Sequence, residues 1–342
     1  MKLFISCTLF IIFLMMLVAC DASGGDHVPY EQGAAIMAEP TPSPTTSQTP
    51  TTIQEPNPTP EVLQQDDQVP FMWQVTAPNG QTMYIFGAIH AAPAELYPLS
   101  QTIMDAFYRS DYLAVEVWET ESSFSPVDVY AYTGGRTLVD DISAELHQRL
   151  TEALAENQIP FSFSYFGVSL ESLDDFMPMM WSSVLAQIAV EKSGLSLRYG
   201  LDSYFIGQAL DRGMDILSIE GSLQQIETLL GLSLPLQTHM VEIALNSVSN
   251  AEAVKRGYEI WRKGDDEGMI AALFEGFTDD GLVEEAFDAL FRKRNLHMAD
   301  MVSFFMAEGK KVFYVVGADH LLGEESVISL LVERGYEVER IR

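Results

Sequence analysis

The stretch that decides the fold is Lys311-Val-Phe-Tyr-Val-Val-Gly-Ala-Asp-His320, an apolar run that stops at a glycine and presents a histidine three residues later. The same pattern occurs near the start of the chain in Thr82-Met-Tyr-Ile-Phe-Gly-Ala-Ile-His90. Both runs are short and rich in β-branched and aromatic residues, which is typical of buried strands. Ligands of open α/β sheets bind at the carboxyl ends of the strands. The paired Gly-x-x-His motifs therefore predict that His90 and His320 contribute to a functional site.

Other strands are expected on both sides of the first motif. The segment 71–76 and the run 82–86 are joined through Pro78-Asn79-Gly80, and Asn-Gly is the strongest short hairpin signal. A helix that opens at Tyr97-Pro-Leu-Ser100, followed by a strand at 112–117, predicts a crossover between parallel strands. Further strands are expected at 215–219, at 312–317 and at 336–341.

Apolar residues at helical spacing fill most of the remaining chain. We expect helices at 143–157, 173–190, 200–212, 223–230, 234–248, 251–262, 267–274, 284–291, 294–308 and 325–334. Pro178 would lie inside the second of these and kink it. Its neighbours Met177, Met179, Met180 and Trp181 either belong to the core or line an apolar groove. The predicted class is α/β (α+β), with a central mixed sheet, Gly-x-x-His motifs at strand ends and a mostly helical cap or insert.

The amino-terminal residues predict export and a lipid anchor. A basic start and an apolar run from Leu3 to Ala19 form a secretory signal over 1–20, and Leu17-Val-Ala-Cys20 resembles a bacterial lipobox. The resemblance implies cleavage before Cys20 and lipid on its sulfur, whereas the alternative is an uncleaved membrane helix. Residues 21–68, rich in Pro, Thr, Ser and Gln, predict a disordered tether, and 69–342 the folded domain. We expect the domain on the extracytoplasmic face of the cell membrane.

Charge and cysteine content limit the partners. The formal net charge of the chain is −30, which argues against nucleic acid and against an anionic membrane surface as partner. The two cysteines, Cys7 and Cys20, both lie in the predicted signal, so no disulfide is expected in the exported domain.

Polar residues gather at the predicted strand ends. They are His90, Glu116, Glu220 and His320. Two imidazoles with a carboxylate form a frequent zinc-type ligand set, and manganese, cobalt or iron suit a more carboxylate-rich site. A metal-free alternative uses one histidine as general base on water, positioned by a glutamate. Arg294, or its neighbour Asn295, is a candidate to bind a substrate carboxylate or a developing oxyanion.

Structural roles are the competing interpretation of each residue. A histidine at a strand end often has its hydrogen bonds supplied by neighbouring residues. Glu220 precedes a predicted helix and could cap it, and an arginine such as Arg294 often forms an ion pair at the surface. His147 and His239 are expected to be structural, as His297 is. Asp202 is expected to cap the helix that starts at Gly200.

Several separated blocks of the chain resemble the TraB/GumN family in the same order. They are Tyr84-Ile-Phe-Gly-Ala-Ile-His90, Glu95-Leu-Tyr-Pro-Leu99, Leu113-Ala-Val-Glu-Val117, Gly200-Leu-Asp-Ser-Tyr-Phe205, Ser218-Ile-Glu-Gly221, Arg294-Asn295 with Met298, and Val315-Val-Gly-Ala-Asp-His320. The match spans about residues 71 to 341. One departure is Asp319, where a small residue is more usual, and this position either adds a ligand or faces solvent.

The resemblance implies a function outside the cell. The family includes the membrane-tethered Tiki-type metal-dependent proteases and proteins that shut down a peptide pheromone. It implies His90 and His320 as active-site elements with Glu116 as the matching acidic residue, and the Arg294-Asn295 block as a further polar segment. We expect His90, His320 and Glu116, together with Glu220 at its strand end, around a divalent metal (Mn, Co or Zn), with Glu116, Arg294 and Asn295 in catalysis. The expected partner is an extracellular peptide or protein substrate. Two alternatives stay open: a non-catalytic lipoprotein that sequesters a peptide signal, and a metal-independent hydrolase similar to the erythromycin esterases.

Overall fold

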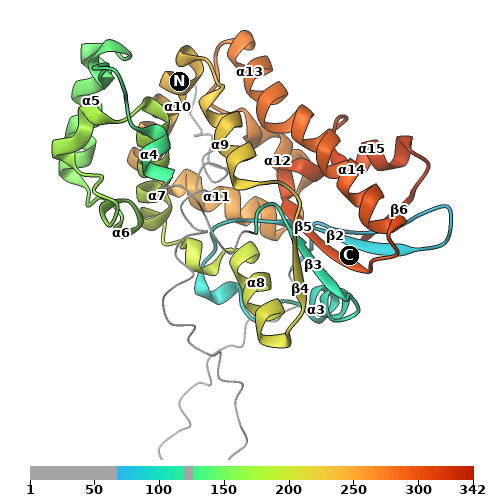
Figure 1. Ribbon diagram of the computed structural model, residues 1–342. Coiled ribbons are helices and arrows are strands. Elements are labelled where there is room, and N and C mark those ends of the chain that lie inside the picture. The colour runs from blue at the N-terminus through green and yellow to red at the C-terminus, as the bar shows by residue number, and fades with distance from the viewer. Residues whose placement is uncertain (1–67, 119–125) are drawn as a thin grey trace, which may run out of the picture. The chain divides into compact units, whose positions relative to one another are not determined.

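The computed structural model of the protein describes residues 68–118 and 126–342. The predicted signal peptide, Cys20 and the tether up to residue 67 lie outside these described residues. The described chain contains a six-stranded mixed sheet with strand order β4-β3-β5-β2-β1-β6 (Figure 1). The strands are β1 (Met72–Thr76), β2 (Thr82–Ala88), β3 (Tyr112–Val115), β4 (Asp215–Ser218), β5 (Val312–Gly317) and β6 (Glu337–Ile341). The predicted α/β class and central mixed sheet are confirmed.

The sheet consists of four parallel strands on one side and two antiparallel strands, β1 and β6, on the other. The predicted hairpin is present: β1 pairs antiparallel with β2, Thr76 lies opposite Thr82, and Gly80 takes the left-handed φ of 84° that the turn requires. β6 pairs antiparallel with the other side of β1. The other four strands, β4-β3-β5-β2, are parallel neighbours. Their carboxyl ends therefore meet at one edge of the sheet.

Helices connect the strands and cover the sheet. They are α3 (Gln101–Tyr108), α4 (Pro126–Tyr130), α5 (Ala144–Glu156), α6 (Phe161–Ser164), α7 (Pro178–Lys192), α8 (Leu201–Arg212), α9 (Ser222–Leu230), α10 (Leu234–Ser249), α11 (Ala251–Arg262), α12 (Asp266–Leu273), α13 (Asp280–Phe287), α14 (Lys293–Ala307) and α15 (Val327–Glu333). In Figure 1, α14 and α15 lie on one side of the sheet, and α3 and α8 lie on the other.

The side chains of β5 alternate between the two helical layers that cover the sheet. Phe313 points to the layer of α3 and α8, where its ring lies 5.6 Å from the Phe107 ring and 4.8 Å from the Phe205 ring. The next residue, Tyr314, points to the opposite layer and donates a 2.9 Å hydrogen bond to the Met298 carbonyl of α14. Successive strand residues face opposite sides, so an unbroken apolar run marks a strand that is buried on both faces.

The predicted helix 173–190 is wrong at its start. α7 begins at Pro178, which occupies the first helical turn, and a 3₁₀ segment, η5 (Leu170–Asp175), precedes it. Proline suits this position because its missing N–H has no helical partner there, so it begins the helix rather than kinking it. Met179, Met180 and Trp181 are buried, which confirms the core interpretation of the methionine cluster.

Two further features complete the described chain. The expected helix 284–291 begins earlier, at α13, and continues through a π-helical turn, η7 (Asp288–Arg292), into α14. Such turns often occur at functional sites. Within residues 68–118 and 126–342, none of the helices has the length and hydrophobicity needed to cross a membrane.

Candidate functional site

The four predicted polar residues lie at the carboxyl ends of the four parallel strands. Glu116 directly follows β3, and Glu220 and His90 each follow their strands, β4 and β2, by two residues. His320 lies in the 3₁₀ turn η8 (Ala318–Leu321) that follows β5. A methyl group placed on Gly317 would lie 3.5 Å from Glu116 Oε1 and 3.6 Å from both His90 Nε2 and His320 Cδ2. The structure therefore brings both histidines and Glu116 around the space beside Gly317.

Arg294, at the start of α14, joins the two glutamates. Its Nη2 donates to Glu116 Oε2 at 2.6 Å and to Glu220 Oε2 at 2.8 Å, and its Nε donates to Glu220 Oε1 at 2.9 Å. The three residues are buried, with exposed fractions of 3% or less. Gln225 adds a 3.1 Å hydrogen bond to Glu220. Ionised side chains this deep in a protein need such partners, because the cost of removing them from water is large.

The guanidinium of Arg294 is fully engaged. Besides the two carboxylates, its Nη1 donates to the Leu290 carbonyl at 3.3 Å and to His320 Nε2 at 3.0 Å. A guanidinium has five N–H donors, and these contacts account for all of them. The predicted role of Arg294 in holding a substrate would require one of these bonds to break. In the structure its hydrogen bonds hold Glu116, Glu220 and His320 in place.

His320 is held as a neutral imidazole. The Asn295 amide nitrogen donates to the Glu325 carbonyl at 2.8 Å, so its Oδ1 is oriented to accept the 2.6 Å hydrogen bond from His320 Nδ1. His320 Nε2 then accepts from Arg294. Burial, and after it the charges of Arg294 and His90, hold the pKa of His320 well below its ordinary value. Asn295, predicted as a catalytic residue, therefore positions His320.

His90 has the opposite surroundings. Its Nδ1 donates a 2.6 Å hydrogen bond to Asp202 Oδ2, and its side chain keeps 11% of its surface exposed. Burial lowers the pKa of His90, but the charge and hydrogen bond of Asp202, together with the charges of Glu116 and Asp319, raise it by more, so its pKa is raised overall. This arrangement leaves Nε2 on the side of Gly317, Glu116 and His320.

Asp202 was expected to cap its helix, and that expectation is wrong. Gly200 occupies the N-cap position of α8, and the Asp202 carboxylate instead accepts from His90. Gly200 allows this approach because a methyl group there would lie 2.3 Å from the His90 carbonyl oxygen. The Leu201 N–H also donates to the Ile89 carbonyl at 3.0 Å. A glycine that opens a helix with an acid two residues later was the available sequence signal.

Glu116 completes the polar centre. Its Oε1 accepts the Gly317 N–H at 2.7 Å, while Oε2 is bound by Arg294. Burial raises the pKa of Glu116, and the charges of Arg294 and His90 offset part of that rise. A carboxylate whose two oxygens are held in this way lies rigidly beside His90 and stabilises a positive charge on that imidazole.

The residues do not fit the predicted divalent metal in this arrangement. Arg294 already occupies His320 Nε2, one oxygen of Glu116 and both oxygens of Glu220. A cation placed among these atoms would also lie against the buried guanidinium, which repels it. Among residues 68–118 and 126–342, no group of three or more His, Cys, Asp or Glu side chains is arranged to hold a metal ion.

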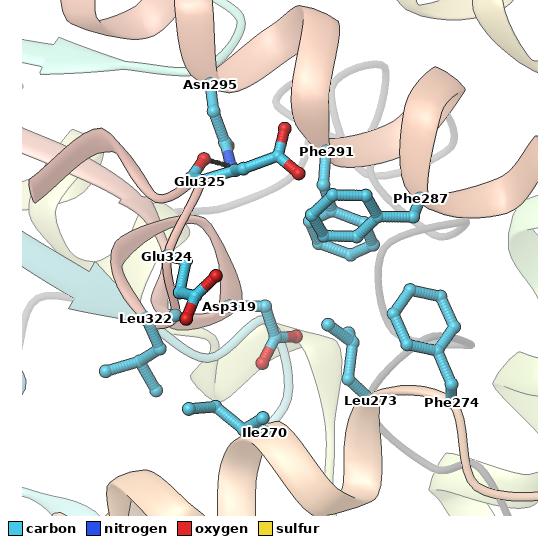
Figure 2. A pocket seen from close by; sticks show the side chains of 11 residues that line it. Ile270, Leu273, Phe274, Phe287, Phe291, Asn295, Asp319, Leu322, Glu324 and Glu325 are labelled. Carbon is cyan, nitrogen blue, oxygen red and sulfur yellow. Dashed lines mark hydrogen bonds between the residues drawn. The ribbon is translucent and has the colours of Figure 1, made fainter. Parts of the chain in front are cut away.

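An apolar pocket of about 210 Å³ adjoins this centre. Asn295, which holds His320, lies on its wall, and so does Asp319, the residue before His320. The Phe291 ring also lines it and lies 5.2 Å from the His320 ring. Figure 2 shows the Asp319 carboxylate pointing toward Ile270 and Leu273. Burial raises the pKa of Asp319 to about 7, with His90 lowering and Glu116 raising it. Asp319 therefore faces this pocket rather than open solvent.

The other histidines of the described chain have local partners. His147 bonds Asp174 at 2.8 Å, His239 bonds Glu242 at 3.2 Å, and His297 donates to the Ile219 carbonyl at 2.9 Å. None of them takes part in the contacts of His90 or His320 given above, which agrees with the structural roles expected for them.

Comparison with known proteins gives a family match and two relatives. The TraB/PrgY/gumN family model matches residues 71–340. The uncharacterized protein YbaP of Escherichia coli (strain K12) is 25% identical over 259 residues, which cover 75% of this chain and 90% of the relative. The YbaP protein of Shigella flexneri gives the same identity and coverage. No solved structure gives a significant match.

Proposed function

The chain belongs to the TraB/PrgY/gumN family, and we propose that it is a hydrolase in which His90 activates water against the carbonyl carbon of a peptide or ester. The observation that carries this proposal is the 2.6 Å hydrogen bond from His90 Nδ1 to Asp202, with Nε2 left facing the space beside Gly317. A histidine fixed by a carboxylate on one nitrogen and open on the other is suited to general-base chemistry.

The proposed reaction uses His90 as base and then as acid. Nε2 takes a proton from water as the water oxygen bonds to the carbonyl carbon. The carbonyl oxygen becomes an oxyanion, and the imidazolium is stabilised by Asp202 and by Glu116. When the oxyanion reforms the carbonyl, the bond to the leaving nitrogen or oxygen breaks, and His90 returns its proton to that atom. The products are a carboxylic acid and an amine or alcohol.

This proposal differs from the metal-dependent reaction that the sequence led us to expect. Three of the four residues expected to bind the metal, His320, Glu116 and Glu220, are hydrogen-bonded to Arg294, so the residues support a metal-independent mechanism better. A metal-dependent reaction would need Arg294 to leave the two carboxylates, and the buried ion pairs oppose that change.

One observation favours a non-catalytic alternative. All five Arg294 N–H groups already donate, so this guanidinium offers no unused donor to an oxyanion. A protein that binds and sequesters a peptide signal would use the same pocket without cleavage. Hydrolysis remains our leading proposal because sequestration gives no role to the partly buried bond between His90 and Asp202.

The cellular location of the protein is also part of the proposal. We infer an extracytoplasmic, lipid-anchored protein whose substrate is an extracellular peptide or protein, since the Leu17-Val-Ala-Cys20 signal precedes the domain. Metabolic labelling with a radioactive fatty acid tests the anchor. Label should appear in the wild type and be lost in Cys20→Ser; label retained in that variant would contradict the lipidation.

Hydrolysis is tested on the full chain with a mixed peptide and ester library. The reaction runs in ¹⁸O-labelled water, with chelator alone or with added Mn, Co or Zn, and mass spectrometry follows the products. We expect ¹⁸O in the new carboxyl group, activity that survives the chelator, and loss of activity in His90→Asn. Activity that returns only with metal would contradict the mechanism, and the absence of any product would favour sequestration.

A further inference from the structure

The pocket beside His320 has an apolar wall contributed by segments far apart in the sequence. Ile270 and Leu273 come from α12, Phe287 from α13 and Phe291 from η7, and Phe274 and Leu322 lie in the loops that follow α12 and η8. The Phe287 and Phe291 rings are stacked with centroids 6.1 Å apart, and the Phe274 ring packs edge-on against both (Figure 2). Aromatic walls of this kind favour a large apolar group over water.

The size of the pocket limits what it can hold. Sites for whole drug-sized ligands usually enclose about 300–1,000 Å³. The pocket here has a volume of about 210 Å³. It therefore suits a single large side chain, while the rest of a peptide would lie outside it.

Asp319 gives this apolar pocket one carboxyl group without a protein donor in the described part of the chain. No hydrogen bond or ion pair joins its carboxylate to another residue of the described ranges 68–118 and 126–342. Its carboxylate nevertheless points into the pocket and interacts electrostatically with His90 and Glu116. A partly buried carboxylate without a donor is costly unless a ligand supplies one. Glu325, at the same pocket, is already bound by Arg292 at 2.6 Å, so Asp319 is the better acceptor for a ligand.

We propose that this pocket recognises the amino-terminal residue of a substrate peptide, with a large apolar side chain among the phenylalanine rings and the α-ammonium on Asp319. The α-carbon of such a residue carries the side chain, the ammonium and the carbonyl together. The pocket and the Asp319 carboxylate match the first two groups, and His90, which interacts electrostatically with Asp319, is the general base toward which the carbonyl would extend. Placing the carbonyl at His90 rests on the proposed hydrolysis, whereas the recognition of side chain and ammonium does not.

A lysine or arginine side chain matches the site less well. Its stem is unbranched and thin, so it would fill the space among the phenylalanine rings less completely than a Leu or Phe side chain, although its charged end could reach Asp319. The inference therefore predicts selection for a free amino terminus, and not for basic residues inside a peptide.

Paired peptides test the inference without relying on a variant. The full chain is given peptides that begin with Leu or Phe, each with a free or an acetylated amino terminus, and matched peptides that begin with Gly. A charge-assisted hydrogen bond corresponds to a preference of about 10–100-fold in kcat/KM for the free terminus. Peptides that begin with Leu or Phe should also exceed those that begin with Gly.

Variants then assign each preference to its residue. Asp319→Asn should remove the preference for a free terminus, and Ile270→Trp, at the half-exposed lip of the pocket, should remove the preference for Leu or Phe over Gly. Glu267→Gln is the matched control, because it removes one negative charge from the exposed side of α12 without lining the pocket. Both preferences should survive in this control.

The two proposals fail in different ways. If the wild type cleaves nothing, hydrolysis is overturned, and the affinity of the same peptides, labelled with a dye at the carboxyl terminus, tests the pocket. Weaker binding after acetylation and in Asp319→Asn would support the pocket on its own. Equal cleavage and equal binding of free and acetylated peptides, or selection for an internal lysine, would overturn the inference while leaving hydrolysis intact.

Discussion

The two Gly-x-x-His segments end neighbouring parallel strands, yet they place their histidines in opposite surroundings. His90, after β2, donates to the Asp202 carboxylate and keeps Nε2 open toward the site. His320, after β5, donates to Asn295 and accepts from Arg294, so both of its nitrogens are engaged. A carboxylate raises the pKa of His90, whereas burial and a guanidinium lower that of His320. Two environments that separate the pKa values of similar groups indicate different roles for them.

The glycines of the two motifs, Gly87 and Gly317, also have different surroundings. A methyl group on Gly87 would lie 2.9 Å from the Ala318 backbone and 3.0 Å from the Phe71 side chain, so this glycine permits close packing. A methyl group on Gly317 would meet the atoms of Glu116, His90 and His320 at 3.5 to 3.6 Å, which is ordinary contact. The glycine of the first motif therefore lets two segments of backbone meet, whereas the glycine of the second lies beside the side chains of Glu116, His90 and His320.

Replacing each histidine by asparagine should separate the roles of His90 and His320 most clearly. His90→Asn keeps a donor for Asp202 but removes the base, so kcat should fall about 10²–10⁴-fold with little change in thermal stability. His320→Asn should act mainly on stability, because it leaves buried donors and acceptors of Arg294 and Asn295 unpaired, at a cost of about 1–3 kcal/mol. Kinetics and thermal unfolding of both variants check this. The reverse pattern would assign the base to His320.

The next largest effect is expected at Arg294. Arg294→Met leaves Glu116 and Glu220 buried without their cation, and removing one partner of such a pair destabilises a protein by about 3–5 kcal/mol. The free energy of unfolding, measured with denaturant, checks this value. Arg292→Met is the matched control two residues earlier: that arginine pairs with Glu325, Glu284 and Asp288 at the surface, and its loss should change stability much less. Equal effects would show that Arg294 does not hold the centre together.

A smaller effect should separate the two glycines. Gly87→Ala forces a methyl group against the Ala318 backbone, and overpacking of this kind costs about 1–3 kcal/mol. Gly317→Ala meets no clash and its φ of −52° suits alanine, so the fold should stay stable while the methyl group fills the space for water and lowers kcat. Unfolding and kinetic measurements on both variants decide this. An active, stable Gly317→Ala protein would place the reaction elsewhere.

The sequence predicted the fold well because the signals are local. Asn79-Gly80 determined the hairpin, and the apolar run before Gly317 marked a strand buried on both faces. The wrong start of α7 has a local cause too: the run 173–190 is apolar on both sides of Pro178, and spacing alone does not show that the helix begins at that proline.

The composition of the site was also predictable, but the contacts among its side chains were not. His90, Glu116, Glu220 and His320 come together because parallel strands end at one edge of the sheet. Which atoms Arg294 binds depends on side-chain geometry in the assembled core, and these contacts occupy three of the four expected metal ligands, Glu116, Glu220 and His320. The partnership of His90 with Asp202 spans 112 residues, and no short motif connects the two.

The central claim is that His90 is the titrating base and His320 a neutral, fixed imidazole. Nitrogen NMR of the histidine-labelled protein over a pH series, with His90→Asn and His320→Asn for assignment, tests this most directly. We predict that His90 titrates with a midpoint above 6.5 and that activity is lost as the pH falls through it, because the base must be neutral. His320 should keep its proton on Nδ1 and stay neutral at pH values well below 6.5. Two histidines that titrate together, or a protonated His320 at neutral pH, would contradict the account.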